Sequence, residues 1–122
     1  MGLLTDFFLA PAKDLAGKRG DQVQPWKFKR RLEGKGVDTL LVEKLGGLVG
    51  VDVELVPSEE DTEQWLFALS PEFISALARL NDAKRKKIAN RWDAPESFLD
   101  TLCELARESE ATGVPMWFWM SL

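Results

Sequence analysis

The sequence predicts an α+β fold in which about five helices pack on a small mixed sheet of about four strands. Short runs of alternating apolar residues near both ends and in the middle indicate the strands, and helical apolar spacing over 37–48 and 70–112 indicates the helices. Runs of helices between strands are typical of α+β proteins. The chain has 122 residues, the length of one ordinary domain, so we expect residues 1–122 to form a single α+β domain.

The first half predicts a strand, two helices and a long irregular segment. Residues 3–9 alternate as a short strand, and residues 12–16 fit a brief helix with Pro11 at its first position and Gly17 at its end. Residues 17–36 contain four Gly and one Pro without a sustained period, which predicts a long loop or insertion. Residues 37–48 carry apolar side chains at helical spacing, which predicts a helix ending near Gly46.

The second half predicts a hairpin and three helices. Residues 51–56 alternate cleanly, and with 65–69 they are expected to form an antiparallel hairpin across the loop 57–63. Ser70 and Pro71 are typical of a helix start. Further helices are expected after Asn81 and after residues 93–96, the last of them ending at Gly113. Parallel neighbours among the strands would require a right-handed crossover.

The last nine residues, VPMWFWMSL, predict a strand that is buried on both faces. Met116, Phe118 and Met120 share one face, and Trp117 and Trp119 share the other. Because neither face is polar, the pattern indicates a strand that other elements cover on both sides. The alternative is an aromatic binding surface, on which both Trp residues would be dispensable for folding.

Composition excludes several chemistries. The chain has no His and a single Cys, so it can form no intrachain disulfide, cysteine-based zinc site or His-dependent catalytic pair. Cys103 falls in helical register with Leu99 and Ala106, which predicts a buried, inert thiol. We therefore expect no catalytic residues, metal site or cofactor. No run of about 18 apolar residues is present, and Asp6 interrupts the apolar start, so we expect a cytoplasmic protein without membrane association.

The charge is uneven along the chain. Residues 1–50 carry nine Lys/Arg and six Asp/Glu, and residues 51–122 carry seven and fourteen, giving +3 and −7 and a total of −4. Six carboxylates between 52 and 63 fit a solvated surface, an acidic docking patch for a basic partner, or a Mg²⁺ or Ca²⁺ site, although their spacing matches no Ca²⁺ loop. These residues are Asp52, Glu54, Glu59, Glu60, Asp61 and Glu63.

A basic and aromatic segment is the second candidate site. Its residues are Trp26, Lys27, Phe28, Lys29, Arg30 and Arg31, with Lys35 further on. Aromatic rings between cations can stack on bases while the cations neutralise phosphates. The same composition arises where aromatic residues point inward and basic ones outward, or where a protein partner binds. The overall acidity argues against general nucleic-acid binding.

Four stretches resemble a group of small bacterial proteins. They are MGLLTDFF, VDTLLVEKLGGLVG, LFALSPEFISALARLNDAKRKKIANRW and ELARESEATGVPMWFWMSL. Members of that group begin near MGxLTDYF and end in an aromatic strand near LYxWxSL. The resemblance implies a small cytoplasmic bacterial α+β domain with no established activity, and it transfers no functional residues. Phe8 and Phe118 stand where the group tends to have Tyr, so no role of a phenol hydroxyl carries over.

Together, these observations favour a non-enzymatic protein-interaction module, with immunity-like partner binding as one form of it. We expect a protein partner and a monomer or homodimer. The alternatives are a small-ligand-binding domain or an enzyme using carboxylates and Lys, and thirdly a weak nucleic-acid binder through residues 26–35.

Overall fold

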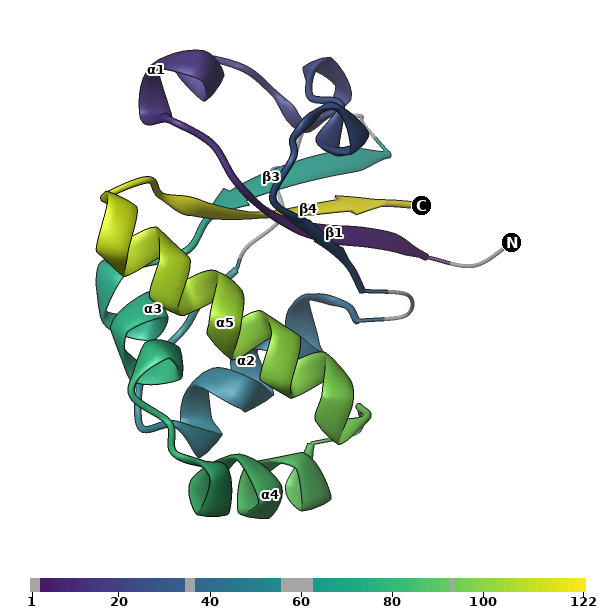
Figure 1. Cartoon of the computed structure of the whole chain (residues 1–122). Coiled ribbons are helices and arrows are strands. Elements are labelled where there is room, and N and C mark those ends of the chain that lie inside the picture. Colours follow the sequence, from purple (N-terminus) through teal and green to yellow (C-terminus); the bar gives the residue numbers. More distant parts are fainter. Residues whose placement is uncertain (1–2, 35–36, 56–62, 93) are drawn as a thin grey trace.

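The computed structural model describes residues 3–34, 37–55, 63–92 and 94–122, which form a helix layer against one sheet (Figure 1). The strands are β1 (Leu4–Leu9), β2 (Arg31–Glu33), β3 (Gln64–Ala68) and β4 (Met116–Ser121), in the order β2-β1-β4-β3. The α-helices are α1 (Ala12–Leu15), α2 (Thr39–Leu48), α3 (Pro71–Ala78), α4 (Asp82–Arg91) and α5 (Glu96–Thr112). Two 3₁₀ turns, η1 (Gly20–Gln22) and η2 (Pro25–Lys27), complete the described elements.

The predicted α+β class, four strands and five helices are confirmed within the described residues. The sheet is antiparallel throughout rather than mixed. The reason lies in the path of α3 to α5, which returns the chain to the end of β3 at which it left the sheet. There the Leu69 amide donates to the Met116 carbonyl at 3.2 Å, and β4 then runs back along β3. No parallel crossover is therefore formed among the described strands.

Helix boundaries follow the predicted capping residues. The Ser70 hydroxyl accepts a hydrogen bond from the Phe73 amide at 3.2 Å, and the Asn81 side chain accepts one from the Lys84 amide at 2.8 Å. Gly113 ends α5 with φ of 72°, a left-handed conformation that Gly adopts most easily. Pro11 precedes α1 as its N-cap rather than occupying its first turn.

The predicted hairpin between 51–56 and 65–69 is wrong. Residues 51–55 form no strand, and residue 56 lies outside the described residues. This segment packs on α2 instead: the Val51 amide donates to the Gly46 carbonyl at 2.8 Å, and a Cβ at Gly46 would lie 2.5 Å from Val53 Cγ2. Val53 is half-buried and Leu55 buried, so the alternation reflects burial against a helix rather than pairing with a strand.

The segment 17–36, predicted as a long loop or insertion, contains one short strand and two 3₁₀ turns. Arg31–Glu33 is the strand β2, which pairs with β1, and η1 and η2 lie before it. Three residues that read polar, apolar, polar are too short to show a period in a sequence. Residues 35 and 36 lie outside the described residues.

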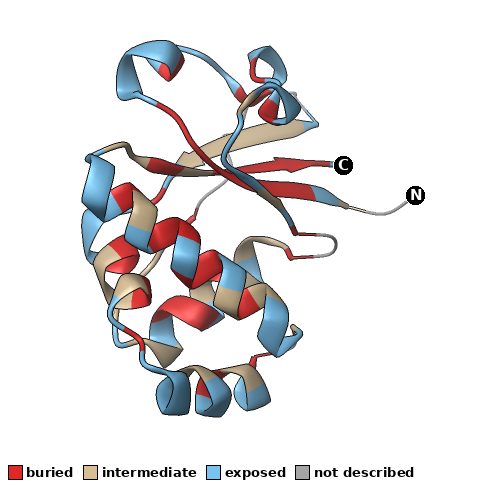
Figure 2. Ribbon diagram, in the orientation of Figure 1, coloured by how far each residue is buried: buried red, intermediate tan, exposed pale blue. Residues whose placement is uncertain are grey.

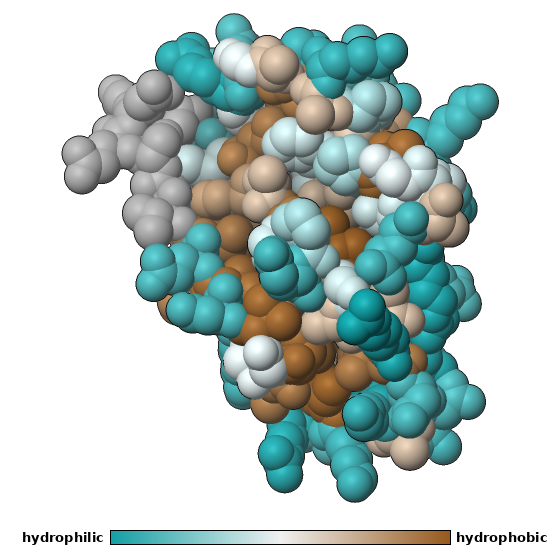
Figure 3. Space-filling model, turned by 90° about the vertical axis from the view of Figure 1, so that its left-hand side faces the viewer, coloured by the Kyte–Doolittle hydropathy of each residue, from teal (hydrophilic) through white to brown (hydrophobic). Residues whose placement is uncertain are grey.

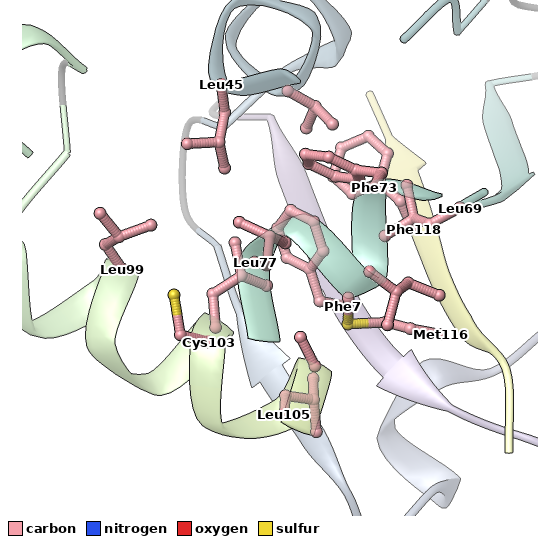
Figure 4. Close-up of a cluster of buried hydrophobic side chains, with 14 of the residues drawn as sticks. Phe7, Leu45, Leu69, Phe73, Leu77, Leu99, Cys103, Leu105, Met116 and Phe118 are labelled. Carbon is pink, nitrogen blue, oxygen red and sulfur yellow. The ribbon is translucent and has the colours of Figure 1, made fainter. Parts of the chain in front are cut away.

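The prediction that the last strand is buried on both faces is confirmed. β4 lies between β1 and β3, and Figure 2 shows both β1 and β4 as mainly buried. On the helix side, Met116, Phe118 and Met120 join the large core drawn in Figure 4. On the other side, Trp119 packs with Phe8, Ala10, Leu15 and Val23 in a smaller second core. Residues 10–28 cover this second core, and we call them the cover segment (Figure 1).

Among the described residues, every helix is too short or too polar to span a lipid bilayer. Cys103 is fully buried on α5, as expected, and burial raises the pKa of its thiol to about 11, with Arg85 and Arg107 opposing the shift. Because the thiolate is the nucleophilic form, this cysteine is poorly suited to chemistry.

Candidate partner-binding site

The candidate site lies on the sheet face that carries the second core, at its β1–β2 side. Asp6 on β1 stands directly opposite Glu33 of β2 and Trp119 of β4, so these three side chains share one face. Arg31 stands opposite Phe8 on the same face. An otherwise apolar face therefore meets three charged side chains where β1 pairs with β2.

Asp6 is a buried carboxylate with an incomplete set of partners. Its side chain is only 8% exposed, and its Oδ1 lies 3.5 Å from Arg31 Nη1. Oδ1 accepts no hydrogen bond among the described residues. Burial raises the pKa of Asp6 to about 6, although the Arg31 guanidinium opposes the shift and the Glu33 carboxylate adds to it. Near neutral pH the site therefore holds an ionised Asp6 carboxylate that burial disfavours.

Arg31 bridges the two carboxylates. Its Nη2 lies 3.3 Å from Glu33 Oε1, while its Nη1 faces Asp6. Both contacts are longer than a charge-assisted hydrogen bond of about 2.8 Å, so the guanidinium saturates neither acid. With both acids ionised, the group Asp6, Glu33 and Arg31 has a net charge of −1.

Trp26 lies beside these charged side chains and is 58% exposed. It belongs to η2, which begins at the buried Pro25. Its ring stands edge-on to Trp119, with centroids 6.3 Å apart, and the Trp119 indole N–H donates to the Gly20 carbonyl at 2.9 Å. These contacts hold a large apolar ring in solvent beside the buried carboxylate.

A hollow of about 160 Å³ lies between these groups. We call it the Asp6 hollow; it is lined by Leu4, Thr5, Asp6, Trp26, Arg31, Glu33 and Trp119. Leu4 is 57% exposed, so the rim is apolar at two points while the floor is charged. Pockets for drug-sized ligands measure roughly 300–1,000 Å³, so this hollow has room for a side chain rather than for a whole ligand of that size.

The structure divides the predicted basic and aromatic segment among three environments. Trp26 and Arg31 line the Asp6 hollow. Phe28 is half-buried and stacks on Phe8 at 4.7 Å, whereas Lys27 and Lys29 are exposed. Arg30 pairs with Glu108 on α5. The segment thus presents no continuous row of stacking rings, which bases would require.

The predicted acidic patch is described only in part. Asp52 and Glu54 are exposed on the segment that follows α2, and Glu63 is exposed just before β3. Glu59, Glu60 and Asp61 lie outside the described residues. Within the described ranges, no group of three or more His, Cys, Asp or Glu side chains is arranged to hold a metal ion.

Two further hollows lie against the helices, and neither is lined by a buried carboxylate. One of about 290 Å³ lies between α3, α5 and the start of β4, and it is lined mainly by apolar side chains. Another of about 330 Å³ lies between the end of α2 and α4, where Lys84, Lys87 and Arg91 border apolar residues. Figure 3 shows apolar surface in the lower half of the molecule, bordered at the bottom by hydrophilic side chains, where α4 lies.

Sequence reasoning noticed Asp6 only as an interruption of an apolar run, and it missed Glu33. The available signal was the charge itself, since an acid inside an otherwise apolar strand must be buried or mark an edge. Comparisons of the chain with protein-family models, curated proteins and solved structures find no match. Geometry alone therefore supports a function.

Proposed function

We propose that this protein is a non-enzymatic protein-interaction module that binds its partner through the surface around Trp26 and the Asp6 hollow. One observation carries the proposal: a Trp ring that is 58% exposed lines a charged hollow of about the size of a side chain. Trp and Arg are the residues most often found where a few contacts dominate the affinity of an interface. Both line this hollow, as Trp26 and Arg31.

The geometry supports binding better than catalysis. A carboxylate with a pKa of about 6 could act as a general base, but a base also requires a substrate positioned beside it. The hollow offers little room for such a substrate, and Arg31 already faces the carboxylate at 3.5 Å. General-base catalysis by Asp6 would not use the exposed ring of Trp26, whereas a protein interface would bury that ring against the partner.

The test is a differential capture experiment. Immobilised wild-type protein, Trp26→Ala and Leu40→Ala are exposed to the same lysate. Leu40 on α2 is 71% exposed and does not line the hollow, so it controls for the loss of any exposed apolar side chain. A partner should be retained by wild type and Leu40→Ala and lost with Trp26→Ala. The purified partner should then bind Trp26→Ala at least about 30-fold more weakly, as expected for an anchor residue.

Equal retention of every captured protein by all three baits would overturn the proposal. The same capture with Glu59, Glu60 and Asp61 reversed to Lys tests the acidic segment as the alternative docking surface. If only that variant fails to retain the partner, the partner binds the acidic segment instead of the surface around Trp26.

A further inference from the structure

We propose that the Asp6 hollow accepts the cationic end of a Lys or Arg side chain from the partner, between the carboxylates of Asp6 and Glu33 and the ring of Trp26. This inference rests on the proposed function and specifies the chemistry of the partner.

Charge selects a cation as the occupant. The charged groups that face Asp6 are Arg31 and Glu33 on β2, while β1, β4 and η2 contribute Leu4, Thr5, Trp119 and Trp26 to the lining. With both acids ionised, two negative charges face one positive charge. An anionic side chain would meet this net negative charge in a partly dehydrated hollow, where like charges repel strongly.

An unused acceptor points to a hydrogen-bond donor. Asp6 is more than nine-tenths buried, and its Oδ1 accepts no hydrogen bond among the described residues. Leaving a buried polar atom without a partner costs roughly 1–3 kcal/mol, and more when the atom is charged. An ammonium or guanidinium entering the hollow supplies N–H donors and a charge at the same point.

Trp26 favours a cation for a second reason. The face of an indole ring attracts cations, by roughly 0.5–1 kcal/mol at exposed sites and more when water is excluded. The ring packs against Trp119 in a T-shaped arrangement, so it already lies beside the hollow before a partner arrives. The apolar stem of a Lys or Arg would lie against Trp26 and Leu4 at the rim.

A metal ion fits these groups poorly. Ca²⁺ takes six to eight oxygen ligands, and Mg²⁺ takes six in a strict octahedron. The hollow offers two carboxylates with a guanidinium between them, and no described cluster of three or more suitable side chains includes them.

The experiment follows the indole N–H signals of the ¹⁵N-labelled protein by NMR. Probes are the capped tripeptides acetyl-Gly-Arg-Gly-amide, acetyl-Gly-Lys-Gly-amide and acetyl-Gly-Glu-Gly-amide, with n-butylammonium as a free amine. The Arg and Lys peptides should shift the Trp26 and Trp119 signals saturably, with millimolar affinity, and should leave Trp92 unchanged. The Glu peptide should shift neither.

Variants and pH make the test specific. Asp6→Asn and Glu33→Gln should each weaken the Arg and Lys peptides about fivefold or more, and the Glu33 side chain is 56% exposed, so its replacement does not threaten the core. Wild-type affinity should fall as the pH drops below about 6, because protonation of Asp6 removes one negative charge from the hollow. This dependence should vanish in Asp6→Asn.

Three results would overturn the proposal: no shift with either basic peptide, an equal shift with the Glu peptide, or unchanged affinity in both acid variants. n-Butylammonium reproduces a Lys side chain without its backbone, so it should shift the same two indole signals about as strongly as the Lys peptide. Failure here can be told apart from failure of the proposed function. If Trp26→Ala abolishes partner binding and Asp6→Asn leaves it unchanged, the proposed binding surface stands and the proposed cationic side chain in the hollow is wrong.

Discussion

At the scale of single residues, Asp6 shows a conflict between stability and use. Its carboxylate lies within a strand whose neighbours Phe7 and Phe8 are fully buried, and its only described cation is 3.5 Å away. A protein selected for stability alone would place an apolar or neutral side chain here. Such conflicts concentrate at functional sites, where stability is given up for a prepared binding geometry.

Replacing Asp6 by Asn should stabilise the protein at pH 7. The folded-state pKa of about 6 exceeds the ordinary value of 3.8, so between these values the folded protein binds more protons than the unfolded chain. Stability therefore falls as the pH rises from about 4 to about 6, by no more than about 3 kcal/mol. Urea unfolding followed by Trp fluorescence should show Asp6→Asn to be the more stable protein at pH 7, with the advantage lost near pH 4.

Glu33→Gln is the matched control, because its side chain is 56% exposed and should change stability by less than about 0.5 kcal/mol. A lower stability of Asp6→Asn at pH 7 would mean that the pairing with Arg31 outweighs the burial of Asp6. The carboxylate would then be structural.

At the scale of elements, the cover segment depends on a close approach to the sheet. A Cβ at Gly20 would lie 2.5 Å from the backbone atoms of Gln64 and Trp65, far inside contact distance. The Gly20 carbonyl also accepts the indole N–H of Trp119. One glycine thus lets η1 rest on β3 and fixes the ring that orients Trp26.

Gly20→Ala should destabilise the protein by roughly 1–3 kcal/mol, because the added methyl group forces the cover segment off rigid backbone. Gly47→Ala is the matched control: Gly47 lies in α2, and a Cβ there would meet nothing within 4 Å. It should be neutral or stabilising by up to about 1 kcal/mol, since Ala favours helices over Gly. Urea unfolding of the two variants gives the comparison, and equal stabilities would show that the cover segment yields without penalty.

At the scale of the whole molecule, the sequence predicts local features such as helix ends better than it predicts which segments pack together. The Ser70 and Asn81 caps, the Gly113 end of α5 and the two-sided burial of β4 were readable because each depends on a few adjacent residues. The partner of residues 51–55 was not readable, because alternation is the same whether a segment packs on a strand or on α2. The Asp6 hollow joins residues from positions 4 to 119, and no local pattern records that meeting.

The sheet separates two cores of unequal size, and this predicts two levels of opening. The smaller core joins Leu15 and Val23 of the cover segment to Phe8 and Trp119 of the sheet, whereas the larger one packs four helices against β1 and β4. Opening free energies within one protein range from near zero to the global value, and the lowest belong to segments with few buried contacts. The cover segment should therefore lift while the helix layer stays folded.

Trp119 carries two probes that separate these events. Its indole N–H donates a hydrogen bond to the Gly20 carbonyl of the cover segment. Its backbone lies in β4, which pairs with a strand on each side. Hydrogen exchange measured by NMR at several urea concentrations should give the indole a lower opening free energy and a weaker urea dependence than the backbone amides of β4. The Trp117 indole, bonded to the Ala10 carbonyl at 2.9 Å, should follow the Trp119 indole. Identical values for indoles and amides would mean that both cores unfold as one unit and that the wall carrying Trp26 is as rigid as the sheet beneath it.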